Sequence, residues 1–122
     1  MSFFGRLASL FSRTGRNDSL LRQGMDHASA NRPTKAIEIY DSLIDSKSAN
    51  VTVRSRALFN RALAYSSLKD DVKATADLEE VVAMPGVPDN VITAARTQLI
   101  RVRNREERHR GREDRVGSQK GR

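Results

Sequence analysis

The stretch ALFNRALAYSSLKDDVKATADLEEVV, residues 57–82, decides the fold predicted for this chain. Leu58, Ala62 and Tyr65 recur at spacings of four and three, the periodicity of one face of an α-helix. The polar run KDD, residues 69–71, interrupts this pattern, and a second helical stripe of apolar residues begins after it. We therefore predict two helices, from about residue 51 to 68 and from about 71 to 83, joined by a tight turn.

A related pattern, SLLRQGMDHASANRPTKAIEIYDSLI at residues 19–44, lies 38 residues earlier. The aligned pairs are Leu20 with Leu58, Gly24 with Ala62, Lys35 with Lys73, Ala36 with Ala74, Tyr40 with Leu78, Asp41 with Glu79, Leu43 with Val81 and Ile44 with Val82. In both copies a small residue on the first helix precedes a small residue on the second by twelve positions. Small side chains would let the two backbones approach, so a repeated helical hairpin is the simplest explanation.

The remaining elements follow from the same signals. Helices are predicted from Ser19 to about Ala30 and from Pro33 to about Ser46, because proline suits the first turn of a helix. The break MPGVPD precedes a fifth helix from about Asn90, which Asp89 could cap. We take residues 18–103 as one helical domain.

These residues resemble the tetratricopeptide repeat (TPR) family. A large apolar residue, a small one four later and an aromatic three further on are typical of its first helix, and the pair KA opens its second helix in both copies here. His27 and Gln23 depart from the pattern, and the interval exceeds the usual period of roughly 34 residues, which we attribute to an extended first helix in the second copy. The resemblance implies an all-α, right-handed stack of antiparallel helical hairpins with about two and a half repeats and flexible basic termini. A generic helical bundle is the alternative.

The same resemblance implies a function. Proteins of this family bind peptides or helices in a concave groove lined by the first helix of each repeat. The corresponding residues here are Leu21, Arg22, Met25, Ser29, Arg56, Phe59, Asn60, Leu63, Ser67, Arg96, Leu99 and Arg103. Leu21 and Met25 stand where a carboxylate clamp would need Lys and Asn, so a mixed apolar and basic groove is expected.

Residues 1–17 are predicted to form a basic amphipathic helix followed by a linker, RTGRND, in which Asn17 or Asp18 could cap the next helix. Its apolar stripe consists of Phe3, Phe4, Leu7, Leu10 and Phe11. This helix could cover the repeats, bind an anionic membrane surface or act as a mitochondrial targeting segment. Gly5 and Arg6 interrupt the apolar run that a secretory signal needs.

Residues 104–122 are predicted to be an arginine-rich, largely disordered tail, because Val116 is the only apolar residue in it. Its basic side chains suggest nucleic-acid binding through Arg101, Arg103, Arg105, Arg108, Arg110, Arg112 and Arg115. Acidic residues interleave with these arginines, and aromatic stacking residues are absent. We therefore rank this hypothesis lowest.

The sequence contains no recognisable catalytic motif. It contains no cysteine, no glycine-rich phosphate loop and no metal-spaced histidine pair, so we expect no enzyme activity, cofactor or metal. The run DLEE, residues 77–80, is interpreted as a solvated helix face. The leading hypothesis is a cytoplasmic adaptor or scaffold that binds another protein, and peripheral membrane association is the alternative.

The predicted array is short, and Leu99, Ile100 and Val102 lack a following helix. We expect another protomer, the N-terminal helix or the partner to cover them.

Overall fold

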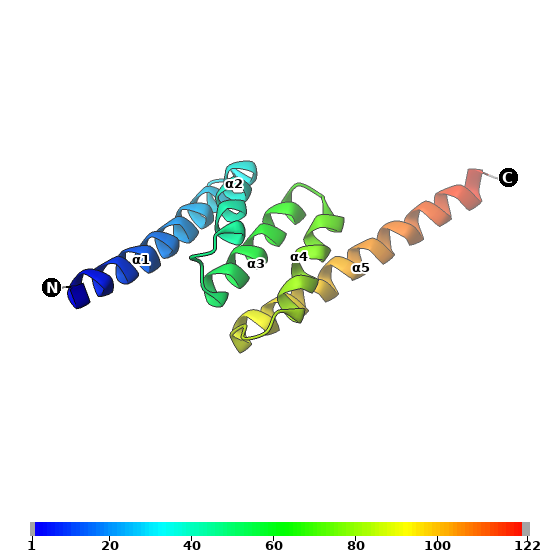
Figure 1. Ribbon diagram of the computed structural model, residues 1–122. Helices are drawn as coiled ribbons and strands as arrows, with labels where there is room; N and C mark the ends of the chain where they lie inside the picture. The colour runs from blue at the N-terminus through cyan, green and yellow to red at the C-terminus, as the bar shows by residue number, and fades with distance from the viewer. Residues whose placement is uncertain (1, 121–122) are drawn as a thin grey trace.

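The computed structural model describes the backbone of residues 2–120 and the side chains of residues 15–117. Five helices follow one another along the chain (Figure 1): α1 (Ser2–Ser29), α2 (Pro33–Asp45), α3 (Val51–Ser67), α4 (Asp71–Ala83) and α5 (Asp89–Lys120). Each helix packs against the next, and no strand occurs between residues 2 and 120. The all-α prediction is therefore confirmed.

Local capping chemistry sets where the central helices begin. The Asn50 side chain accepts a hydrogen bond of 2.9 Å from the backbone N–H of Val53 at the start of α3. Asp70 accepts one of 3.2 Å from the N–H of Lys73 at the start of α4. Such caps satisfy backbone donors that the first turn of a helix leaves without a partner.

The turns α1–α2 and α3–α4 have the same backbone geometry. Asn31 and Lys69, 38 residues apart, adopt left-handed φ angles of 61° and 63°. In the first turn the N–H of Arg32 donates to the carbonyl of His27 at 2.8 Å, and in the second the N–H of Asp70 donates to that of Tyr65 at 2.9 Å. The 38-residue interval seen in the sequence thus extends to the hydrogen bonds of the turns.

The buried core consists of two clusters that meet at α3. Val53 and Ala57 pack with α1 and α2, whereas Leu58 and Ala62 pack with α4 and α5. Because α3 contributes to both clusters, it is the central helix, and the partly buried Ile44 packs against both clusters.

Gly24 of α1 lies close to α2, as predicted, but the group that it accommodates there is the aromatic ring of Tyr40. A Cβ atom on Gly24 would lie 2.5 Å from Cε1 of Tyr40, a fully buried side chain on α2. The repeat-equivalent positions in the second hairpin are Ala62 and Leu78, which are also fully buried. A smaller residue on the first helix therefore accompanies a larger one on the second.

The linker expected at RTGRND, residues 13–18, is wrong, because α1 continues through it to Ser29. Asn17 and Asp18 lie within the helix and cap nothing. Asn17 is buried, and its amide donates to the Ser48 hydroxyl at 3.3 Å, so the loop between α2 and α3 holds this part of α1. The side chains of the apolar stripe, Phe3, Phe4, Leu7, Leu10 and Phe11, lie outside the described residues, and their membrane, capping and targeting roles stay predictions.

The disordered tail expected after residue 103 is also not what the structure shows, because α5 continues to Lys120. No proline follows Pro88, and Arg and Glu, which dominate the segment, have high helix propensity. Asp89 is the first residue of α5 rather than its cap.

The end of the array is better covered than the sequence suggested. Leu99 and Val102 are buried in the core, whereas Ile100 is 59% exposed. Within the described part of the chain α1 does not contact α5, which lies at the other end of the molecule (Figure 1). The described residues of α1 therefore do not cover this end of the same chain.

Candidate protein-binding surface

Helices α1, α3 and α5 lie on one side of the molecule. The middle helix, α3, contacts both α1 and α5, whereas α2 and α4 pack only against their chain neighbours among the described residues. The first helices of successive hairpins are therefore adjacent, and they provide the surface on which the predicted groove residues can be placed.

A hollow of about 450 Å³ lies between α1 and α3. It is lined by Leu21, Arg22, Met25, Ser29 and Arg56, all of which the sequence placed in the groove. Leu21 is almost fully buried, whereas Met25 is 45% exposed. The apolar surface of this hollow is thus open to a partner.

Two acidic residues, Asp18 and Asp26, also line this hollow. They stand beside Arg22 and Arg56, so the hollow carries charges of both signs. The groove residues predicted from the sequence were apolar, basic or uncharged polar, and these carboxylates, which lie one helical turn on either side of Arg22, were not among them.

The predicted residues further along α3 differ in their availability. Leu63 is at the surface and Phe59 is half-buried against the core. The Asn60 amide donates to the Arg56 carbonyl at 2.8 Å, and the Ser67 hydroxyl donates to the Ala64 carbonyl at 2.7 Å. Both polar groups are thus engaged with their own helix.

The predicted residues on α5 belong to a different hollow. Arg96, Leu99 and Arg103 lie between α5 and α4, where Glu79, Val82, Ala83 and Ile100 complete the lining. Arg103 forms an ion pair of 3.5 Å with Glu79. The structure therefore brings together the α1 residues and Arg56, and it separates them from the three predicted on α5.

The register of α5 explains this separation. Buried residues of α3 and α5 correspond at the same 38-residue interval: Val53 with Val91, Ala57 with Ala95 and Ala64 with Val102. The α5 counterparts of Phe59, Asn60 and Leu63 are consequently Thr97, Gln98 and Arg101. Applying the repeat interval a second time would have identified them from the sequence.

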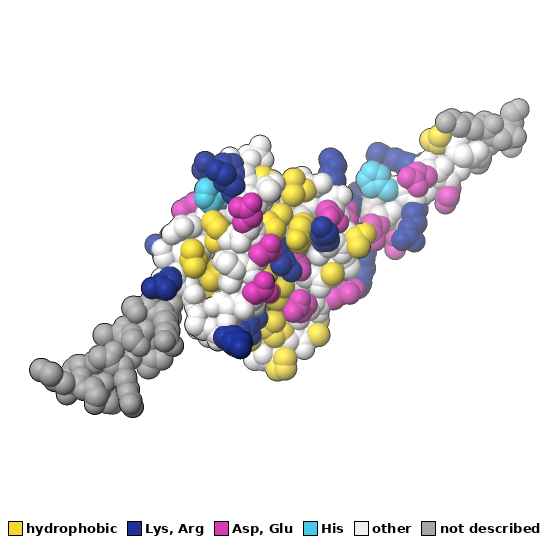
Figure 2. Space-filling model, turned by 45° about the horizontal axis from the view of Figure 1, so that its top comes forward, with side chains coloured by type: hydrophobic (Ala, Val, Ile, Leu, Met, Phe, Trp, Pro, Cys, Tyr) yellow, Lys and Arg dark blue, Asp and Glu magenta, His cyan; other side chains and the backbone are white. Residues whose placement is uncertain are grey.

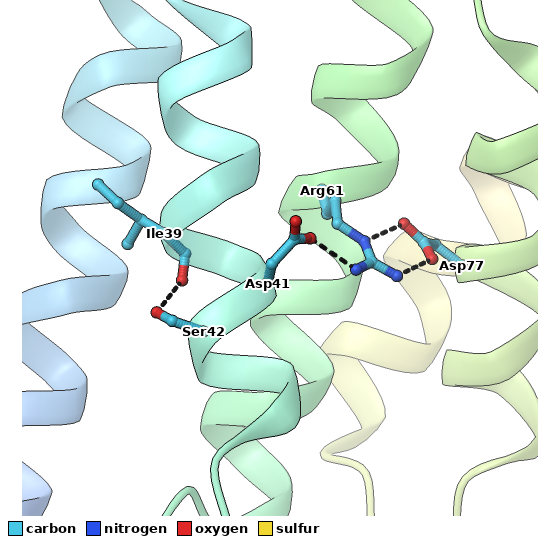
Figure 3. Close-up of polar contacts among 5 residues, drawn as sticks. All are labelled: Ile39, Asp41, Ser42, Arg61 and Asp77. Carbon is cyan, nitrogen blue, oxygen red and sulfur yellow. Dashed lines mark hydrogen bonds and ion pairs between the residues drawn. The ribbon is translucent and has the colours of Figure 1, made fainter.

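Arg61 links three helices on the other side of α3 (Figure 3). Its Nε and Nη2 donate to the two carboxylate oxygens of Asp77 on α4 at 2.8 and 2.7 Å, and its Nη1 donates to Asp41 on α2 at 2.8 Å. The hydrogen bond with Asp77 raises the pKa of Arg61 above its usual value; burial opposes this effect and Asp41 adds to it. The bidentate pair fixes the position of α3 between the two second helices.

These contacts correct the interpretation of residues 77–80 as a solvated face for Asp77, whereas Glu79 and Glu80 are exposed as expected. Asp77 is buried against Arg61, and Glu79 pairs with Arg103 on the following helix. Glu79 is the repeat equivalent of Asp41, which likewise pairs with the following helix. Asp41 thus connects α2 to α3, and Glu79, at the equivalent position, connects α4 to α5.

Among the described residues, no helix is long and apolar enough to cross a bilayer. In the same part of the chain, no three His, Asp or Glu side chains are grouped closely enough to hold a metal ion. No family model, curated protein or solved structure matches the chain.

Proposed function

We propose that this chain is a non-catalytic interaction module of the TPR type, which binds a peptide or helix of a partner protein on the side formed by α1, α3 and α5. The observation that carries the proposal is the identical turn geometry of the two hairpins at Asn31 and Lys69. Two equivalent hairpins whose first helices are adjacent are what a helical-repeat array requires.

The α1–α3 hollow supplies the chemistry for recognition. Met25 and Leu63 are exposed apolar side chains on adjacent helices, and Leu21 lies at the base of the hollow. Arg22 and Asp26 provide charges in the same hollow as Leu21 and Met25. This surface suits a segment with an apolar anchor flanked by polar or charged residues, because apolar centres with polar rims are typical of interfaces.

Affinity capture of partner proteins by the folded full-length chain tests this proposal. Met25→Glu, alone and with Arg56→Glu, should abolish capture because the first change places a carboxylate on the apolar surface of the hollow. Val72→Glu is a matched control, since Val72 is 78% exposed on α4 and does not line the α1–α3 hollow. Equal capture by the hollow variants and the control variant would overturn the proposal.

A further inference from the structure

The arginines at the end of α5 divide between two faces of the helix. The order Arg-x-Arg-x-Arg-acid-acid occupies residues 101–107 and again 108–114, and Arg115 follows. At about 100° per residue, five of these arginines fall within an arc of about 80°. We call them the arginine row: Arg101, Arg105, Arg108, Arg112 and Arg115.

The acidic residues of the same segment lie away from the arginine row. Glu106, Glu107, Glu113 and Asp114 are about 120–140° from its centre and flank Arg103 and Arg110, which are on the opposite face. Acids that interleave with arginines in the sequence are therefore separated from the row by the helix. This removes the principal argument that the sequence offered against a polyanion ligand.

The C-terminal part of α5 projects beyond the other helices (Figure 1), and the arginine row extends along it from Arg101, the neighbour of the buried Val102. Arg105 anchors it, since its guanidinium contacts Asp71 of α4 at 3.3 Å and Ser66 of α3 at 3.4 Å. The other four arginines are exposed and have no ion pair among the described side chains. Figure 2 shows basic side chains, with acidic ones and a histidine among them in this view, along the projecting helix, which no other element covers among the described residues.

The surroundings of the arginine row favour one class of ligand. Asn104, His109 and Gly111 lie beside it, and Val116 is the one apolar side chain after Val102. A membrane-binding helix needs an apolar face, and a stable protein interface needs an apolar or aromatic centre. Interfaces with DNA are instead polar and strongly positive, and arginine forks match phosphate oxygens.

The spacing of the row fits an extended array of phosphates. Its arginines recur every three or four residues, which is about 5 Å along the helix axis, and Arg101 to Arg115 span about 21 Å. Single-stranded ligands would need aromatic stacking residues, and residues 101–122 contain none. We propose that the arginine row binds the phosphate backbone of duplex DNA without sequence preference, with the acidic face turned away from the duplex.

Fluorescence anisotropy of the full-length chain with a labelled duplex of about two helical turns tests the proposal across a range of salt concentrations. Four phosphate contacts predict a slope of about −3.6 for the logarithm of the association constant against that of the salt concentration. Arg108→Gln or Arg112→Gln should make the slope shallower by about 0.9. Arg110→Gln removes the same charge from the opposite face and should leave the slope unchanged.

A second pair of variants changes the geometry at constant charge. Gly111→Pro should interrupt the helix between Arg108 and Arg112 and weaken binding. Gly111→Ala should preserve it, because a Cβ at Gly111 would meet no atom within 4 Å.

Three results would overturn the proposal. The first is no binding to the duplex at low salt. The second is equal loss for Arg108→Gln and Arg110→Gln, which would indicate net charge alone. The third is binding to anionic vesicles or to a poly-glutamate peptide but not to the duplex, which would assign the arginine row to a lipid surface or an acidic protein.

Discussion

Replacement of Arg61 by methionine removes the one cation that joins α2, α3 and α4 in this network. It leaves Asp77, whose side chain is only 6% exposed, without its bidentate partner. Loss of one member of a buried ion pair typically costs about 3–5 kcal/mol, because the remaining charge stays desolvated. Arg61 is itself 20% exposed, so we expect the lower half of that range, about 3–4 kcal/mol.

The partners of Arg61 should differ in their effects. Asp41 is 47% exposed, so Asp41→Asn should lower the free energy of unfolding by about 1 kcal/mol or less. The double variant Arg61→Met with Asp77→Leu removes both buried charges and should recover most of the stability lost in Arg61→Met.

Urea denaturation followed by circular dichroism at neutral pH measures all three variants on one scale. Arg61→Met should have the lowest free energy of unfolding of the three variants, and the double variant should have a free energy of unfolding close to that of the parent protein. If Arg61→Met and Asp41→Asn had equal, small effects, the Asp77 site would be open to water, and the structural role assigned to this pair would be wrong.

Three further predictions concern the core. Gly24→Ala should destabilise the protein by about 1–3 kcal/mol because its Cβ would clash with the Tyr40 ring, and adding Tyr40→Leu, the pairing found in the second hairpin, should restore stability in thermal melts. Burial raises the pKa of Tyr40 to about 12, so as pH rises the unfolded chain loses the phenol proton before the folded chain does. The free energy of unfolding should therefore be unaffected by this group below pH 10 and should fall between pH 10 and 12. Urea titrations of Tyr40→Phe should lack this fall. Leu99→Ala should cost about 2–4 kcal/mol, whereas Ile100→Ala, at a 59% exposed site, should cost about 0.5 kcal/mol or less; similar costs in denaturant melts would show that Ile100 is covered in solution.

Much of the secondary structure followed from local signals in the sequence. The helices α3 and α4 begin at the predicted residues, 51 and 71, and in the structure Asn50 and Asp70 each satisfy a backbone donor three residues further on. The 38-residue interval was also found from the sequence, because residues 38 positions apart have similar side chains and this comparison needs no knowledge of the fold.

Contacts between distant residues could not be read in the same way. Asn17 was taken for a linker residue because its partner, Ser48, lies 31 positions away. Asp77 was taken for a solvated residue because its burial depends on where α3 places Arg61. A sequence pattern shows which residues share a helix face, but packing decides what that face meets.

By itself, the sequence determined that this chain is helical and where its central helices begin, because helical periodicity acts over a few residues. Tertiary structure decided that α1 is unbroken, that the groove residues predicted on α5 lie against α4, and that Arg61 joins three helices. These features depend on burial and charge pairing between residues far apart in the chain, and only the packed arrangement of helices brings those residues together.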